Sequence, residues 1–144
     1  MDIKSNIPVL IKRVSLKFEK EANHILTEYN VTASQLKTLK FLFGHPNLTV
    51  TQHDIELFFS MTNPTVTGIL QNLEKKNFIF RQQNPNDARS KVIGFTEQSL
   101  QFKTKLEQLS HQLETDLTKQ LTNDEHQTLI YLLTKLLNDN DKVD

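Results

Sequence analysis

An apolar pattern of helical period runs along most of the chain and is broken once, between residues 78 and 95. Inside that interval, segments 79–83 and 91–95 are short and contain the β-branched and aromatic residues typical of strands. Between them, the run Asn84-Pro85-Asn86-Asp87-Ala88-Arg89 consists of residues of the kind that form turns. The pattern therefore predicts a mainly α-helical fold with one small β-hairpin.

Local signals place the ends of the first two predicted helices. The spacing of apolar side chains predicts a long helix over 7–28. Thr32 stands three residues before Gln35, which is the spacing of a capping box at the start of a second helix. Gly44 followed by Pro46 is a stop signal, so the second helix should end at residue 43.

Two further helices are predicted in the middle of the chain. A short one begins after Thr51, whose hydroxyl can cap it. The next begins after Thr62 and covers 63–76, with Pro64 in the first turn, where a missing N–H costs nothing. Asn77 then fits a left-handed cap, a position where glycine is commoner.

Two helices complete the chain, one after Thr96 and one after the capping box formed by Thr122 and Glu125. The predicted order is long helix, helix, short helix, capped helix, hairpin and two final helices. A short helix, a tight turn, a capped helix and a basic hairpin form the layout of a winged helix-turn-helix. The fold class is thus mainly α with one small β-hairpin wing, and further helices lie on either side of the winged helix-turn-helix in the sequence.

One face of the helix at 63–76 has the composition of a DNA-reading surface. Its apolar side chains fall on one side at about 100° per residue, and the opposite side is polar, small and nearly free of acid. Such a face can approach base edges in the major groove, where Gln71 can pair with adenine. The candidate contacts are Thr62, Asn63, Pro64, Thr65, Thr67, Gly68, Gln71 and Lys75. The alternative interpretation is an ordinary solvated surface helix.

The predicted hairpin supplies a second candidate contact. Arg89 and Lys91 lie at or beside its tip, where they can reach phosphates or a narrow minor groove, and Asp87 can orient the guanidinium of Arg89. The full set of candidates here is Arg81, Asn86, Asp87, Arg89, Ser90 and Lys91. An ordinary charged turn is the alternative, but the two signals in this order are more specific than either alone.

Composition limits the remaining possibilities. The chain has 144 residues, 17 basic and 17 acidic side chains and no cysteine, which excludes disulfides and thiol-based sensing. From residue 96 onward nine acidic side chains accompany five basic ones, so the rest of the chain is mildly basic. No segment has the length of a signal-peptide core or a membrane span, so we expect a single-domain, cytoplasmic protein without membrane contact.

The stretch 51–96 resembles the DNA-binding core of the MarR family of bacterial regulators. The most characteristic pieces are Thr65-Val66-Thr67, Leu73-Glu74-Lys75-Lys76, and Asp87-Ala88-Arg89-Ser90-Lys91 leading to Phe95-Thr96. Segments 31–35 and 121–125 also match the usual starts of the second and last helices. Within the family, the chain looks closest to the branch that represses multidrug efflux pumps.

The resemblance implies one MarR-type domain over 1–144, with a DNA-binding lobe at 32–96 and a dimerisation lobe made of 1–30 and 97–144. It implies a homodimer that binds a pseudo-palindromic operator in double-stranded DNA, with two reading helices about 34 Å apart. It also implies a repressor that a small apolar or aromatic ligand releases. Phe18, Phe41 and Phe102 are candidates for the ligand pocket, although the simpler interpretation of each is a core residue.

The sequence also allows other functions. Glu21, His24, Glu107 and His111 could meet across the fold as a zinc site, which would make the protein a metal-sensing variant of the same regulator. A helical homodimer that binds other proteins would explain the leucine-rich helices but not the hairpin. No catalytic triad, phosphate loop or zinc-protease motif occurs, so we expect neither an enzyme nor a cofactor.

Overall fold

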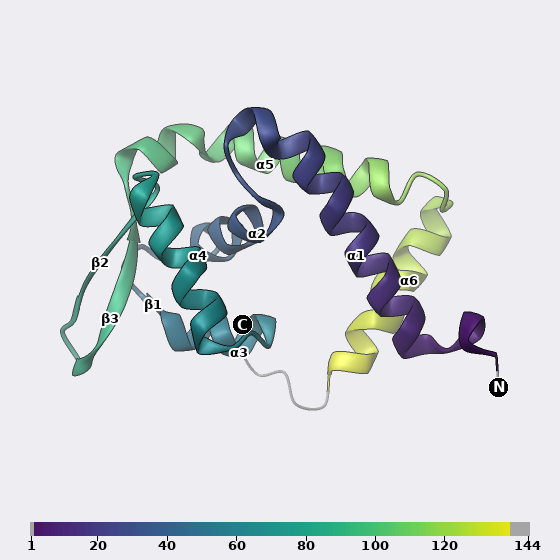
Figure 1. Cartoon of the computed structure of the whole chain (residues 1–144), viewed down its shortest axis with the longest axis horizontal. Coiled ribbons are helices and arrows are strands. Elements are labelled where there is room, and N and C mark those ends of the chain that lie inside the picture. Colours follow the sequence, from purple (N-terminus) through teal and green to yellow (C-terminus); the bar gives the residue numbers. More distant parts are fainter. Residues whose placement is uncertain (1, 139–144) are drawn as a thin grey trace.

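A computed structural model describes residues 2–138 of the chain. A small sheet lies at one edge of the molecule beside the helices, and its two longer strands project from that edge (Figure 1). The helices are α1 (Ile7–Leu26), α2 (Ala33–Phe43), α3 (Gln52–Phe59), α4 (Asn63–Lys75), α5 (Glu97–Leu117) and α6 (Asn123–Leu137), with single 3-10 turns η1 (Ile3–Ser5) and η2 (Thr27–Tyr29). The strands are β1 (Val50–Thr51), β2 (Ile79–Asn84) and β3 (Asp87–Phe95). The predicted fold class is confirmed.

Threonine caps start five of these helices, as the sequence predicted. Each hydroxyl accepts a hydrogen bond from the backbone N–H three residues later, which satisfies a donor that the first turn would otherwise leave free. The capping threonines are Thr32, Thr51, Thr62, Thr96 and Thr122. Capping boxes form at Thr32 with Gln35 and at Thr122 with Glu125, and also at Thr51, where Asp54 returns the bond. Asn77 is left-handed, with φ of 62°, as expected for its cap.

The sheet corrects the expected hairpin in two respects. It has three antiparallel strands in the order β1-β3-β2, because Val50 and Thr51 pair with Ile93 and Val92. The hairpin strands are also longer than predicted, and pairing continues to Asn84 and Asp87 on either side of a tight turn. The predicted loop at 84–89 is wrong, because cross-strand pairing extends β3 back to Asp87. The outer part of the hairpin has no alternation of apolar and polar residues, so its strands cannot be recognised from the sequence pattern.

Gly94 is required where β3 passes the other parts of the sheet. A Cβ at this position would lie 2.5 Å from the ring of Phe80 and 2.8 Å from the side chain of Leu48. The glycine therefore lets a ring from β2 and a leucine from the preceding loop pack against the backbone of β3, which fixes the base of the hairpin.

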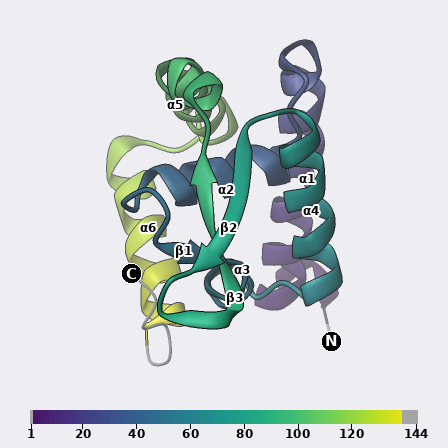
Figure 2. The same cartoon turned by 90° about the vertical axis from the view of Figure 1, so that its left-hand side faces the viewer.

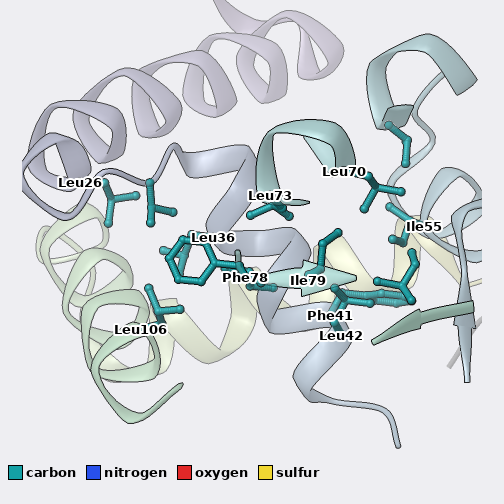
Figure 3. Close-up of a cluster of buried hydrophobic side chains, with 14 of the residues drawn as sticks. Leu26, Leu36, Phe41, Leu42, Ile55, Leu70, Leu73, Phe78, Ile79 and Leu106 are labelled. Atoms are coloured by element: carbon teal, nitrogen blue, oxygen red, sulfur yellow. The ribbon is translucent and has the colours of Figure 1, made fainter. Parts of the chain in front are cut away.

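One hydrophobic core joins helices α1 to α5 and the sheet (Figure 3). Leu39, Ile55, Leu70 and Leu73 have no exposed surface, and they come from α2, α3 and α4. Leu26 at the end of α1 and Leu106 in α5 are equally buried in the same cluster. The core thus fixes the orientation of α4 relative to both long helices.

Helix α6 and the first half of α1 lie on the side of the molecule far from the hairpin (Figure 1), and both expose apolar side chains. Helix α6 has no buried residue, and the first half of α1 buries none either. The exposed side chains on these two helices are Ile7, Leu10, Ile11, Val14, Leu16, Leu129, Ile130, Tyr131, Leu132, Leu133, Leu136 and Leu137. Within residues 2–138, no helix combines the length and the apolar character needed to cross a membrane.

Candidate nucleic-acid interface

The turn between α3 and α4 sets how α4 is presented. Ser60 ends α3 in the left-handed conformation, with φ of 53°, and the Met61 N–H donates to the carbonyl of Glu56 at 3.0 Å. Thr62 then caps α4. Because Val66, Leu70 and Leu73 are fully buried, the opposite face of α4 points outward.

The structure places the candidate residues of α4 on or beside that outward face. Thr62, Asn63, Pro64, Thr65, Gln71 and Lys75 are exposed, and Thr67 and Gly68 are half-buried. A Cβ built on Gly68 meets no atom within 4 Å, so packing inside the molecule does not require glycine there. The face carries hydrogen-bonding groups and one lysine, and its acid, Glu74, lies in the last turn.

Polar side chains of α3 hold the first turn of α4. The Gln52 amide donates to the Thr67 hydroxyl at 2.9 Å and to Glu56 Oε2 at 3.1 Å. The Asn63 amide donates to the same oxygen of Glu56 at 2.9 Å. The roles of Gln52 and Glu56 are not evident from the sequence, because they depend on contacts between α3 and α4 that neither helix reveals alone.

The hairpin presents its cations near the tip. The side chain of Arg89 is 93% exposed, and its Nε lies 3.5 Å from Asp87 Oδ1, which also accepts the Arg89 backbone N–H at 3.0 Å. Lys91 and Asn86 are exposed, and Ser90 accepts a hydrogen bond from the Asn84 amide at 3.1 Å. The local pair of Asp87 with Arg89 therefore has the geometry that the sequence suggested.

Arg81 lies at the base of the hairpin, away from the tip. Its guanidinium forms an ion pair with Glu74 at 2.5 Å, and the side chains of Arg81 and Glu74 are 25% and 34% exposed. This pair joins β2 to the last turn of α4. Arg81 therefore links the hairpin to α4, and it is also a candidate contact with nucleic acid.

A groove of about 660 Å³ lies between α3, the start of α4 and the hairpin. Arg81, Arg89 and Lys91 line it from the hairpin, and His53 and Glu56 from α3. The tip of the hairpin and the N-terminal end of α4 lie toward the same end of the molecule in both views (Figure 2). One extended surface can therefore be contacted by both elements at once.

The three candidate pocket phenylalanines lie in different places. Phe18 lines an apolar groove of about 550 Å³ between α1, the start of α2 and α6. Phe41 packs in the core against His45, Phe58 and Phe59, whereas Phe102 packs against Phe78. The structure thus leaves only Phe18 at this groove.

The residues considered for zinc are not assembled as a site. Across residues 2–138, no three His, Cys, Asp or Glu side chains lie close enough together to hold a metal ion. On α1, His24 shares a surface with Lys17, Lys20 and Glu21.

A core-packed helix-turn-helix followed by a basic hairpin over the same groove defines a winged helix-turn-helix protein. The MarR family model matches residues 31–91. The multiple antibiotic resistance protein MarR of Escherichia coli (strain K12) is 33% identical over 129 residues, which cover 89% of this chain and 88% of that protein. The chain belongs to the MarR family of winged-helix transcriptional regulators.

Other relatives and solved structures agree with this assignment. The organic hydroperoxide resistance transcriptional regulator of Bacillus subtilis (strain 168) is 28% identical over 105 residues, 73% of this chain and 70% of that protein. The S. aureus MepR–DNA complex matches with a TM-score of 0.80 and 30% identity over 92% of this chain and 96% of that one. A mutant MarR from E. coli complexed with operator DNA matches with a TM-score of 0.78 and 32% identity over 89% and 91%.

Proposed function

We propose that this protein regulates transcription by binding a specific double-stranded DNA operator as a homodimer. The observation that carries the proposal is the polar outward face of α4 beside the exposed cations of the hairpin, both bordering one groove. The relatives named above are regulators, and two structural neighbours are complexes with DNA. Because its partner would be chromosomal DNA, we place the protein in the cytoplasm.

In the proposed complex, α4 enters the major groove and the hairpin follows the backbone beside it. The side chains in the first turns of a recognition helix contact base edges, and this helix presents amide and hydroxyl groups there. Arg89 is free enough to reach a phosphate or a narrow minor groove. These assignments extend to the set Thr62, Asn63, Pro64, Thr65, Thr67, Gly68, Gln71, Lys75, Arg81, Asn86, Asp87, Arg89, Ser90 and Lys91.

The proposed dimer forms through the exposed apolar surfaces of α1 and α6. Such a large apolar area is unusual on a soluble monomer and is covered when two copies associate. We therefore assign 32–96 to DNA binding, and 1–30 with 97–144 to dimerisation. Met1 and residues 139–144 of that second lobe lie outside the described residues.

We place a response to a small apolar or aromatic ligand in the groove beside Phe18. Its volume of about 550 Å³ is in the range of small-molecule sites. Apolar side chains of α1 and α6 form most of its walls, and Lys37 and Glu19 supply charge. A compound bound there would touch α1, α2 and α6, and could thereby couple the dimer to the core behind α4.

Fluorescence anisotropy with two duplexes tests the proposed DNA binding. One duplex carries the DNA upstream of the protein's own gene, and the other has a random sequence of the same length. We expect tight binding to the first, a large preference over the second, and steep weakening as salt rises. Equal and weak binding to both, and to a wider set of genomic fragments, would contradict the proposal.

A further inference from the structure

Glu56 is a carboxylate on a surface that should face phosphates. Its side chain is only 18% exposed, and it lines the groove together with Asp87. Asp87 is paired with Arg89, whereas Glu56 lies beside the imidazole of His53, with Nδ1 3.8 Å from Oε1. A negative charge here opposes nonspecific attraction to DNA, so its position calls for a separate explanation.

The contacts of Glu56 restrict the amide of Asn63. A carboxylate can only accept hydrogen bonds, so the Asn63 atom that lies 2.9 Å from Oε2 must be Nδ2, the donor. The amide therefore cannot reverse without placing its oxygen against a negative charge. Asn63 is the first residue of α4 and is exposed, so its Oδ1 stays available as an acceptor for another molecule.

Glu56 acts on a second position of α4 through Gln52. The Gln52 amide nitrogen donates to Glu56 and also to the Thr67 hydroxyl, at 3.1 and 2.9 Å. The Thr67 oxygen is thus used as an acceptor, which leaves its own proton for donation. Asn63 and Thr67 are four residues apart and hence one above the other on the helix.

We propose that Glu56 is a specificity-determining positioning residue, which fixes the hydrogen-bonding polarity of Asn63 and, through Gln52, of Thr67. With Oδ1 held outward, Asn63 suits a base that offers an amino group in the major groove, which means adenine N6 or cytosine N4. Glu56 does not touch the DNA in this arrangement and acts through its neighbours. The proposal rests on the function proposed above.

Glu56→Gln tests this role, because a glutamine can present either its oxygen or its nitrogen to Asn63. The measurement is the preference among the four base pairs at each operator position, from competition anisotropy with single-substitution duplexes. We expect the preference at the position read by Asn63 to fall about tenfold, the size of one good base contact. Affinity for a random duplex should hold or rise, since one negative charge is gone.

Two further variants separate the effect of hydrogen-bonding polarity at residue 56 from the effect of its negative charge. Glu107→Gln makes the same charge change at an exposed site on α5, and it should leave the base preference unchanged. Glu56→Asp keeps the charge but shortens the side chain, so it should lose contact with Asn63 and lose the preference. Thermal unfolding of each variant verifies that the fold is intact, and Glu56→Asp carries the test if Glu56→Gln does not fold.

The decisive comparison repeats Glu56→Gln in an Asn63→Ala background. If Glu56 acts through Asn63, the substitution then changes the preference at that position no further. A parental preference profile in both Glu56 variants, or an equal loss with and without Asn63, would overturn the proposal while leaving specific DNA binding intact. A parent protein without any sequence preference would overturn the proposed function, and the role of Glu56 with it.

Discussion

Gly68 stands on the outward face of α4 where nothing inside the molecule needs a glycine. Replacing it with alanine should therefore stabilise the helix by about 1 kcal/mol, because glycine is the poorer helix former. We expect Gly68→Ala to unfold at a higher denaturant concentration and yet bind the operator more weakly, since the added methyl would meet the DNA. Denaturant unfolding and anisotropy check the two effects, and operator affinity equal to that of the parent would show that α4 does not approach DNA closely at this residue.

A substitution of Arg89 tests the contact that the hairpin is proposed to make with DNA. Its side chain is 93% exposed and bonds only to its neighbour Asp87 among the described residues. Arg89→Ala should leave folding and the dimer unchanged but weaken binding to all duplexes alike, with a salt-dependence slope shallower by about 1. The measurement is anisotropy at several salt concentrations, with size-exclusion chromatography as the control. An unchanged slope would remove Arg89 from the contact set.

Individual residues differ in how far sequence alone could assign them. Arg89 and the outward side chains of α4 follow from local pattern, because exposure on a helix or at a turn is a local property. Gln52 and Glu56 could not be found this way, since they act across the junction of two helices. Arg81 was assigned to the wing, but its ion pair with Glu74 depends on how β2 returns beside α4.

At the scale of elements, Thr96 joins three parts of the fold. Its hydroxyl caps α5 by accepting the Ser99 N–H at 3.1 Å, and it donates to the carbonyl of Asn77 at 2.6 Å. Thr96→Ala should lower the free energy of unfolding by about 1–2 kcal/mol, at the upper end for a lost cap. Denaturant titration measures this, with Thr122→Ala as the matched control, because Thr122 caps α6 at an exposed site. Equal losses in the two variants would mean that the bond to Asn77 contributes nothing.

Helix ends were predictable and strand ends were not, for a physical reason. A cap is a contact between residues three apart, so Thr32, Thr62 and Thr122 announce their helices in the sequence. Strand β1 has two residues and exists only because β3 lies beside it. The outer hairpin is likewise held by pairing between strands, while its side chains face solvent and carry no apolar alternation.

At the scale of the whole molecule, the proposed dimer depends on α6. Replacing both Leu129 and Leu133 with glutamate places charges in the apolar surface of α1 and α6, where they would be buried on association. We expect a monomer in sedimentation velocity and much weaker binding to a full palindrome. Leu100→Glu is the control, because Leu100 is a similarly exposed leucine near the start of α5. A double variant that remains dimeric would move the interface elsewhere.

The whole-molecule organisation was only partly accessible from sequence. The order of elements predicted a winged helix-turn-helix, and the fold confirms it. The continuous core is less evident from sequence, because Leu26 and Leu106 join it from helices assigned to the other lobe. The same burial explains why the proposed lobes at 32–96 and at 1–30 with 97–144 cannot move as independent bodies without opening shared core.

Helix α5 begins two residues after β3 ends and runs for 21 residues to the turn before α6. At about 1.5 Å per residue it is about 31 Å long, and in the proposed dimer it sets the separation of α4 and the hairpin from the dimer axis. One residue inserted into α5 would rotate α4 and the hairpin by about 100° relative to the proposed dimer axis. One base pair of DNA, in contrast, advances about 3.4 Å with a turn of about 35°. An insertion of one or a few residues into α5 does not match a shift of one or a few base pairs along the duplex. The binding sites available to this protein should therefore differ in base sequence while the distance between their halves stays constant.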